Sequence, residues 1–513
     1  MRRPTDPVAL SRGRRWAALA VLSASLLVVT MDLTILNVAL PELAADIEPS
    51  ATEQLWIVDV YSLVLAGLLI SMSAFADRRG RKLVLLAGFA VFGGASALVV
   101  VADSPLAVIA VRALLGIGGA MIMPTTLSMV RSIFLDPAER ATALGVWSAV
   151  SAVGAAVGPI VGGFLLEHFS WQAAFLVNVP LMVLGIAAGV VLLPEVRVPR
   201  PGRWDAVATA LSIAGMVALI WSIKHFAKQQ DLLDPLALAA LAAALVLLVA
   251  FVRRCLRRDD PLLDVRLFAS RPFTAGVVAA LGTMFGLAAV LFLLAQWLQL
   301  VEHHGPLAAG VRLLPLAGAG LLSSIVAPPL AARIGPRLVL AAGLAVAGAG
   351  LLVLGLAGRD LAYGTVAVAL ALVGGGVGSL AMASAIIMLG TPNERAGSAA
   401  AIEESAYDVG NVLGVAILGS VAALLYRDGL DLGPALSGAL GPEASAHAEG
   451  SLAAATAIAD EARLPALASH AGDAFVSALA DTSLIGGVAM LAVAALVFVL
   501  VPRGMTLTGS AHH

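Results

Sequence analysis

Long apolar runs separated by short polar breaks dominate the 513-residue chain. Each run is long enough for one helix to cross a bilayer, which takes about 20 residues. This pattern predicts an all-α integral membrane protein with fourteen transmembrane helices. The predicted spans are 16–40, 55–76, 83–102, 105–129, 141–166, 173–193, 206–223, 236–252, 273–300, 307–331, 338–356, 361–389, 396–425 and 482–501.

Composition supports this class and excludes several others. Hydrophobic residues make up 60% of the chain and charged residues 12%, with a mean hydropathy of +0.97, far from an ordinary soluble domain. Cys255 is the only cysteine, so there is neither a disulfide framework nor a thiolate metal site. The chain has no basic face for nucleic acid, no ATP-binding glycine loop and no recognisable catalytic cluster. We therefore expect no enzyme, no metal, no cofactor and no nucleic-acid partner.

Positive charges are distributed unequally between the two sets of loops. If the N-terminus is cytoplasmic, 24 of the 31 lysines and arginines lie in cytoplasmic segments. The positive-inside rule then places both termini in the cytoplasm. Arginine outnumbers lysine 28 to 3, which is typical of GC-rich coding, so we expect a bacterial plasma membrane. The five positive residues outside are Lys224, Lys228, Arg359, Arg427 and Arg463.

An internal repeat divides the chain into halves. FADRRGRK (75–82) follows span 2, and the similar LAARIGPR (330–337) follows span 10. Glycine-punctuated segments recur with the same offset of eight spans, at 154–163 in span 5 and 409–419 in span 13. Parallel duplication of this kind is common in transporters. We expect a six-helix bundle at 1–200, two inserted helices and a linker at 201–271, and a second six-helix bundle at 272–513.

One segment between predicted spans is much longer than the other loops. Residues 426–480 form a long polar region on the outside, and its pattern after Ser451 predicts short amphipathic helices interrupted at Pro465. Both a lid or vestibule and a merely solvated loop are consistent with this composition.

Span 1 contains a carboxylate in an apolar setting, Asp32. An ionised Asp near the centre of a membrane helix costs roughly 2.5–3.5 kcal/mol, so it faces protein or water and is usually functional. Pro41 and Glu42 are expected to end this helix, which places Asp32 two to three turns below the mouth of a cavity. A purely structural pairing is the alternative. Arg112 in span 4 also needs an anion, and Asp32 is a suitable partner with or without a coupling role.

Span 13 carries three further acids. Glu404 and Asp408, four residues apart, share a helix face, whereas Glu403 is turned about 100° away. Two neighbouring carboxylates cannot both ionise cheaply, so we expect the pair to titrate as a unit and to carry protons. The alternative is a capping role close to Arg395.

Asp59 in span 2 follows Trp56 by one turn. A carboxylate beside an aromatic ring can hold an organic cation by charge and cation–π attraction, although Trp56 can equally be an interfacial anchor. The candidate residues lining a cavity are Trp56, Trp147, Gln296, Trp297, Tyr407 and Asn411.

The loop after span 2 has the features of a latch. Gly80 permits a tight turn, and Asp77 can accept from Arg81 or cap a neighbouring helix, which suits a state open to the outside. The second copy has Ala332 in place of Asp77, so only the first half has an acidic latch.

Span 5 contains a run of glycines that favours close helix packing. Gly154, Gly158 and Gly162 share one face, and Pro159 removes a backbone hydrogen bond and allows a kink. The motif is completed by Gly163.

Together these segments resemble one known family. MDLTILNVALP (31–41), ADRRGRK (76–82), RALLGIGGAMIMP (112–124) and GAAVGPIVGG (154–163) resemble the fourteen-span drug:proton antiporters of the major facilitator superfamily, especially QacA- and LfrA-like multidrug efflux pumps. The resemblance covers nearly the whole chain. It implies two six-helix bundles plus two inserted helices, and a span 5 motif that closes the interface between the halves.

The resemblance also implies a function. We expect proton-coupled export of lipophilic cations, such as quaternary ammonium antiseptics, dyes and cationic drugs, by a monomer in lipid that works by alternating access. An exporter of a neutral antibiotic or an endogenous metabolite is the alternative. The expected coupling and cation-binding residues are Asp32, Asp59, Arg112, Glu403, Glu404 and Asp408, and the gating residues are Asp77, Arg78, Gly80 and Arg81. The chain departs from the family pattern at Ser73, where glycine is usual, so looser packing is expected there.

Overall fold

The computed structural model describes residues 10–49, 51–196, 205–229, 233–358, 361–389, 391–392 and 395–505, and this part of the chain is helical without strands. The α-helices are α1 (Arg12–Ile47), α2 (Ala51–Arg79), α3 (Arg81–Leu98), α4 (Pro105–Ile133), α5 (Pro137–His168), α6 (Ala173–Leu176), α7 (Asn178–Leu192), α8 (Ala206–Gln229), α9 (Pro235–Arg257), α10 (Arg271–Gln296), α11 (Pro306–Arg312), α12 (Leu314–Ile334), α13 (Pro336–Ala357), α14 (Tyr363–Gly376), α15 (Gly378–Leu389), α16 (Ala396–Leu413), α17 (Gly419–Gly429), α18 (Gly433–Gly450), α19 (Leu452–Ala462) and α20 (Pro465–Leu500).

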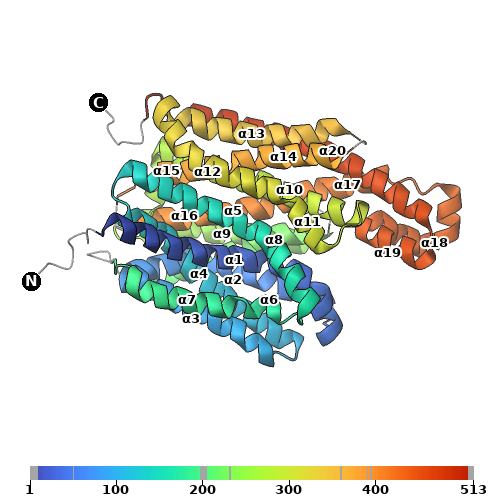
Figure 1. The fold of residues 1–513 in the computed structure, drawn as a ribbon, viewed down its shortest axis with the longest axis horizontal. Coiled ribbons are helices and arrows are strands. Elements are labelled where there is room, and N and C mark those ends of the chain that lie inside the picture. Colours follow the sequence, from blue (N-terminus) through green and yellow to red (C-terminus); the bar gives the residue numbers. More distant parts are fainter. Residues whose placement is uncertain are drawn as a thin grey trace, which may run out of the picture.

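The long helices run side by side, with both chain ends at one end of the molecule (Figure 1). We call this the terminal end, and the opposite end, where α18 and α19 project, the distal end. In the first half α1 packs on α5, α2 on α4 and α3 on α7; in the second, α10 packs on α16, α12 on α14 and α13 on α20. The halves meet where α5 contacts α12 and α15, and where α16 contacts α2 and α4.

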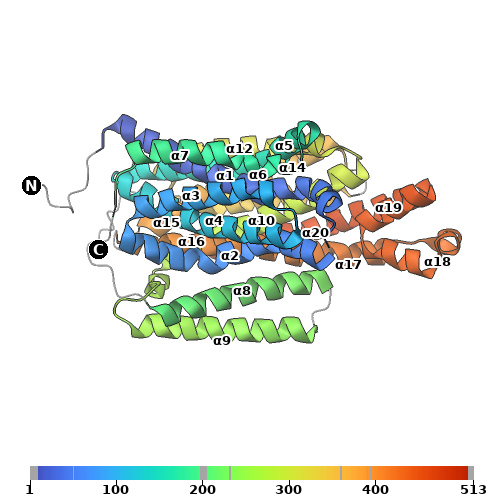
Figure 2. The ribbon, with the colours of Figure 1, turned by 90° about the horizontal axis from the view of Figure 1, so that it is seen from below.

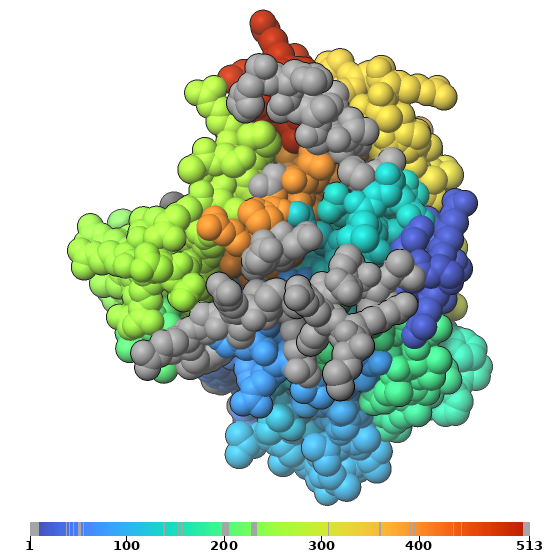
Figure 3. All heavy atoms as spheres, turned by 90° about the vertical axis from the view of Figure 1, so that its left-hand side faces the viewer, coloured from blue at the N-terminus to red at the C-terminus, as the bar shows by residue number. Residues whose placement is uncertain are grey.

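The inserted helices α8 and α9 lie outside the two halves, and α8 packs against α2 (Figure 2). Figure 3 shows the molecule viewed from the terminal end. The light-green segment, which joins this pair to the second half, protrudes on one side. Arg254 Nε of α9 donates to both oxygens of Asp205, at 3.0 and 2.8 Å, and thereby joins the start of α8 to the end of α9. The helices therefore form three packed groups, and the domain bounds at 200 and 271 stay a prediction.

Thirteen helices in the described part are long and apolar enough to cross a membrane. The remaining predicted span, 141–166, lies in α5, a 32-residue helix that is not among the thirteen, so the count of fourteen stays a prediction. The predicted domain boundary at residue 200 lies outside the described residues, as do the charges counted at Arg2, Arg3, Arg197, Arg200, Arg203 and Arg359.

The expected end of the first helix was wrong. α1 continues through Pro41 and Glu42 to Ile47. The added turns are fixed by Trp171, whose backbone N–H donates to Glu42 Oε1 at 3.2 Å and whose indole N–H donates to Asp46 Oδ2 at 2.8 Å. These tertiary contacts outweigh the hydrogen bond that a proline removes within a helix.

The duplicated loops fold alike. Gly80 before α3 has a φ of 113° and Gly335 before α13 has a φ of 91°. Both values lie in the left-handed region that glycine adopts without steric cost. The two loops thus share a positive φ at the corresponding glycine.

The long outer segment is more ordered than a solvated loop. It contains α18 and α19, and the predicted break at Pro465 is the first residue of α20. However, α20 runs for 36 residues without interruption, so residues 465–480 extend the last spanning helix and are not part of the loop.

Candidate functional site

Asp32 lies in a sealed polar cluster inside the first half. Its side chain is 0% exposed, and Arg112 Nη1 of α4 donates to Asp32 Oδ2 at 2.9 Å. Asn178 Nδ2 of α7 donates to Asp32 Oδ1, also at 2.9 Å. Both oxygens therefore have a donor, as a buried carboxylate requires. The pairing with Arg112 agrees with the sequence, but Asp32 does not line the cavity found in this conformation.

The acids of α16 form a second buried group. Ser384 Oγ of α15 donates to Glu403 Oε1, and Tyr407 Oη, one turn further along α16, donates to the same oxygen at 2.5 Å. Glu404 has both carboxylate oxygens buried with no hydrogen-bond partner among the described residues, and Asp408 Oδ2 is in the same situation. Glu404 and Asp408 interact electrostatically, as their shared helix face predicts.

None of these contacts supports the capping alternative. α16 begins after Arg395 with no side-chain cap, and Arg395 Nη1 instead pairs with Asp264 Oδ2 at 2.6 Å. Glu403 and Glu404 lie about two turns into the helix, and neither bonds its terminus. α16 approaches α10 closely because Gly410 and Gly414 lie on the backbone carbonyls of Leu281 and Phe285.

Tyr61 lies between the two acidic groups. It is fully buried in α2, and the Arg112 guanidinium lies 4.5 Å from its ring centroid. Its hydroxyl has no hydrogen-bond partner in the described part, and it interacts electrostatically with both Asp32 and Asp408. Tyr61 is not among the residues predicted from the sequence, although a tyrosine two residues after a membrane carboxylate is a usable signal.

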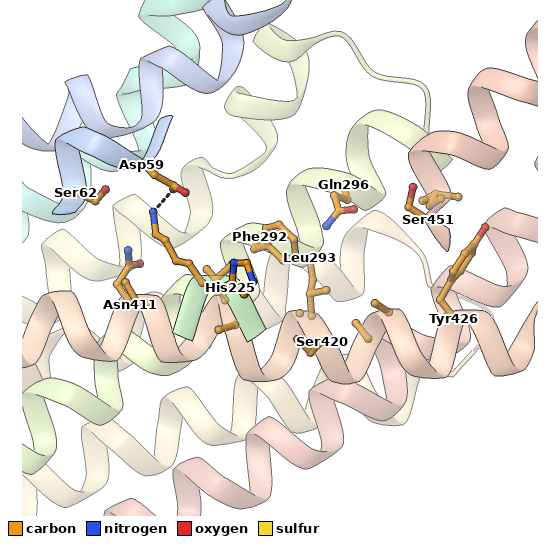
Figure 4. Close-up of a pocket in the computed structure, with 18 of the residues that line it drawn as sticks. Asp59, Ser62, His225, Phe292, Leu293, Gln296, Asn411, Ser420, Tyr426 and Ser451 are labelled. Atoms are coloured by element: carbon orange, nitrogen blue, oxygen red, sulfur yellow. Dashed lines mark hydrogen bonds and ion pairs between the residues drawn. The ribbon is translucent and has the colours of Figure 1, made fainter. Parts of the chain in front are cut away.

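A cavity of about 960 Å³ lies toward the distal end, where the first half, the insert and the second half meet. Figure 4 shows its polar side chains projecting from these different elements. Of the predicted lining residues, it contains Trp56, Gln296 and Asn411, and it also contains the predicted cation-binding residue Asp59. The elbow between α18 and α19, at 450–452, forms part of its wall.

Three predicted lining residues are elsewhere. Trp147 is buried and its indole N–H donates to Thr126 at 3.2 Å, while Trp297 is 1% exposed and packs in the core. Tyr407 is turned toward Glu403. Large aromatic side chains gain most from full burial, and this gain explains why these residues lie in the core. Helix periodicity alone does not show which aromatic residues will be buried.

The inserted helix contributes the main basic side chain of the cavity. Lys224 of α8 forms an ion pair with Asp59 of α2, drawn as a dashed line in Figure 4. Trp221 and His225, on the same face of α8, are stacked with ring centroids 4.6 Å apart. Sequence analysis assigned no role to this helix, although the spacing of Trp221, Lys224 and His225 places them on one face.

The predicted latch joins the two halves at the terminal end. Arg81 Nε donates to Asp77 Oδ1 at 2.9 Å, and the Asp77 carboxylate lies against Gly397 in the first turn of α16. Ser73 Oγ donates to Gly397 O at 2.7 Å. Looser packing at Ser73 was therefore a wrong expectation, because its hydroxyl makes a bond across the interface.

The predicted gating residue Arg78 donates to Ala74 O at 3.1 Å on its own helix.

The glycine motif of α5 serves a different contact from the one expected. A Cβ at Gly154 would lie 2.9 Å from Leu27 O, and one at Gly158 would lie 2.8 Å from Met31 O, both in α1 of the same half. Gly162 likewise faces Ile35 of α1. Only Gly163 faces the second half, at Leu307. Since one helix face meets one partner, the repeated glycines hold α1 and α5 together.

Comparison with known proteins agrees with this architecture. Residues 22–415 match the model of the Major Facilitator Superfamily. The chain is 40% identical over 496 residues to the multidrug efflux pump LfrA of Mycolicibacterium smegmatis, covering 96% of this chain and 97% of that protein. It is 39% identical over 415 residues to the methyl viologen resistance protein SmvA of Salmonella typhimurium, covering 79% and 82%.

A solved structure has the same fold. The human organic anion transporter MFSD10 superimposes with a TM-score of 0.60 over 93% of this chain and 99% of that chain, at 14% identity. Such low identity establishes the fold alone. With its spanning helices and its bacterial relatives, the chain belongs to the major facilitator superfamily and is a multi-pass membrane transporter in the same family as LfrA.

Proposed function

We propose that the protein is a bacterial multidrug exporter that exchanges lipophilic cations from the cytoplasm for external protons. Two relatives are named for multidrug efflux and for resistance to methyl viologen, which is a dication. The described wall of the distal cavity is mostly apolar and contains one carboxylate, Asp59. Apolar walls with few polar groups are typical of sites for organic molecules.

The environment of Glu404 is the observation that most strongly supports proton coupling. Both of its carboxylate oxygens are buried without a donor among the residues that the structure describes. An ionised carboxylate in such a place is very unfavourable, so the group requires either a proton or a cation. A site that accepts one or the other, but not both, couples their movements in opposite directions.

The contacts at the terminal end support a state closed toward the cytoplasm. Asp77, Ser73 and Gly397 join the halves there, while the cavity that contains Asp59 lies at the opposite end. Because the basic loop residues gather at the terminal end, we place both termini in the cytoplasm. Rocking of the halves would then carry the site from one side to the other, as in other transporters built from repeats.

Everted membrane vesicles test the proposal. We expect an imposed pH gradient, acid inside, to drive accumulation of ethidium and methyl viologen, and collapse of the gradient to stop it. The apolar walls of the cavity favour one alternative, export of a neutral antibiotic or metabolite. Accumulation of neutral drugs without any cation would support that alternative and contradict the proposal.

A further inference from the structure

We propose that Lys224 is a tethered cation that occupies the substrate's charge site and expels the transported cation on the distal side. This inference rests on the proposed function and gives the inserted helix α8 a part in it. Lys224 would make the insert a determinant of cation affinity and release.

The position of Lys224 supports this role. Its ammonium group pairs with Asp59, and the two side chains are 27% and 30% exposed inside the cavity. Lys224 also interacts electrostatically with Asp408 of α16. One flexible ammonium from the insert therefore pairs with a carboxylate of the first half and lies within electrostatic range of a carboxylate of the second half.

No other described residue of the cavity wall can take its place. Lys224 is the only lysine or arginine among the described lining residues. His225 is the other basic group, but it stacks on Trp221, and its Nε2 lies 3.5 Å from Asp234 Oδ1, at the start of α9. The charge facing Asp59 is thus supplied by Lys224.

A tethered ion competes strongly with a free one. A group held by a short flexible link has an effective concentration of the order of millimolar, whereas drug concentrations are much lower. A substrate cation must therefore displace Lys224 from Asp59, and Lys224 recaptures the carboxylate as the substrate leaves. Without the ammonium, cations should bind more tightly and leave more slowly.

Binding of ethidium to the purified full-length protein tests the inference. We expect Lys224→Met, which keeps the length of the side chain but removes its charge, to lower the Kd for ethidium about tenfold, or roughly 1.4 kcal/mol. Turnover in proteoliposomes should fall. Lys224→Gln should behave like Lys224→Met, and Lys224→Arg like the wild type. Lys82→Met is the matched control, since Lys82 bonds Val190 O at the terminal end, far from the cavity.

The outcomes separate the two proposals. An unchanged or raised Kd in both neutral variants, with efflux of cations intact in the wild type, would overturn the role of Lys224 alone. If the wild type neither binds nor transports any cation, the proposed function fails and the role of Lys224 fails with it. An equal gain in affinity for the neutral dye Nile red would show that Lys224 acts by bulk and not by charge, which also contradicts the inference.

Discussion

The Asp77 carboxylate lies so close to Gly397 that a Cβ on residue 397 would overlap it. Gly397 is in the first turn of α16, where the backbone N–H groups and the helix dipole favour an anion. The contact therefore joins the two halves at the terminal end and depends on the absence of a side chain.

Gly397→Ala and Asp77→Ala should both weaken closure of the terminal end. We expect each to slow efflux of every substrate by a similar factor, about tenfold, with little change in substrate preference, because the contact lies away from the cavity. Rates for several dyes in everted vesicles measure this. Gly364→Ala is the control, since a Cβ there meets nothing within 4 Å. A loss confined to one drug would place the loop in the binding path.

Asp32→Asn should abolish proton-driven efflux of cations while the protein still folds. Arg112 would keep an amide neighbour but lose its counter-charge, and leaving one member of a buried pair alone typically costs about 3–5 kcal/mol. The melting temperature should therefore fall, and Arg112→Gln in the same chain should restore part of it. Asp103→Asn, on an exposed turn, is the control. Wild-type efflux by Asp32→Asn would exclude a coupling role.

Neutralising the α16 acids should affect divalent substrates most. A dication needs two negative charges to offset its loss of water. We expect Glu404→Gln and Asp408→Asn to reduce methyl viologen efflux at least tenfold, and ethidium efflux less. Glu403→Gln should be milder, because Gln can still accept from Ser384 and Tyr407. Equal effects in all three variants, or the greatest loss at Glu403, would contradict this assignment.

Gly158→Ala should destabilise the first half. The new Cβ would lie 2.8 Å from Met31 O, so α1 and α5 must move apart. Overpacking of this kind costs about 1–3 kcal/mol, which a thermal melt in detergent will show. Gly94→Ala is the matched control, since a Cβ there meets nothing within 4 Å. Equal melting temperatures for the two variants would show that the contact is not tight.

The stability of the inserted pair should depend on acid pH through Asp205. The hydrogen bond from Arg254 lowers the pKa of Asp205 below its ordinary 3.8. The stabilisation that ionised Asp205 contributes is therefore complete above pH 3.8. It is lost as the pH falls through the lower pKa of Asp205 in the folded protein. We expect Asp205→Asn to melt below the wild type at pH 7, with the gap between the two melting temperatures narrowing as the pH falls below 3.8. A gap that stays constant as the pH falls further would exclude this linkage.

Features carried by local pattern could be predicted from the sequence. Apolar periodicity located the helices, and the spacing of Glu404 and Asp408 placed them on one face. The need of Arg112 for an anion pointed to Asp32. These inferences depend only on helix geometry and on the cost of burying charge.

Features set by contacts between distant segments could not be predicted from the sequence. The continuation of α1 past Pro41 depends on Trp171, more than a hundred residues away. Burial of Trp147 and Trp297 depends on which helices surround them. The pairing of Lys224 with Asp59 depends on α8 lying against α2. No local pattern reports which face of an inserted helix meets the rest of the molecule.

The α18–α19 hairpin extends past the distal ends of the other helices (Figures 1 and 2). In the proposed orientation, with the terminal end inside the cell, this hairpin would lie outside the membrane and would offer an epitope for a nanobody. Ser451 and Leu452 at its elbow belong to the cavity wall, so a binder clamped there would also hold the exit in one shape. The same complex would add a rigid external mass to a small membrane protein, which is what particle alignment in electron cryomicroscopy requires.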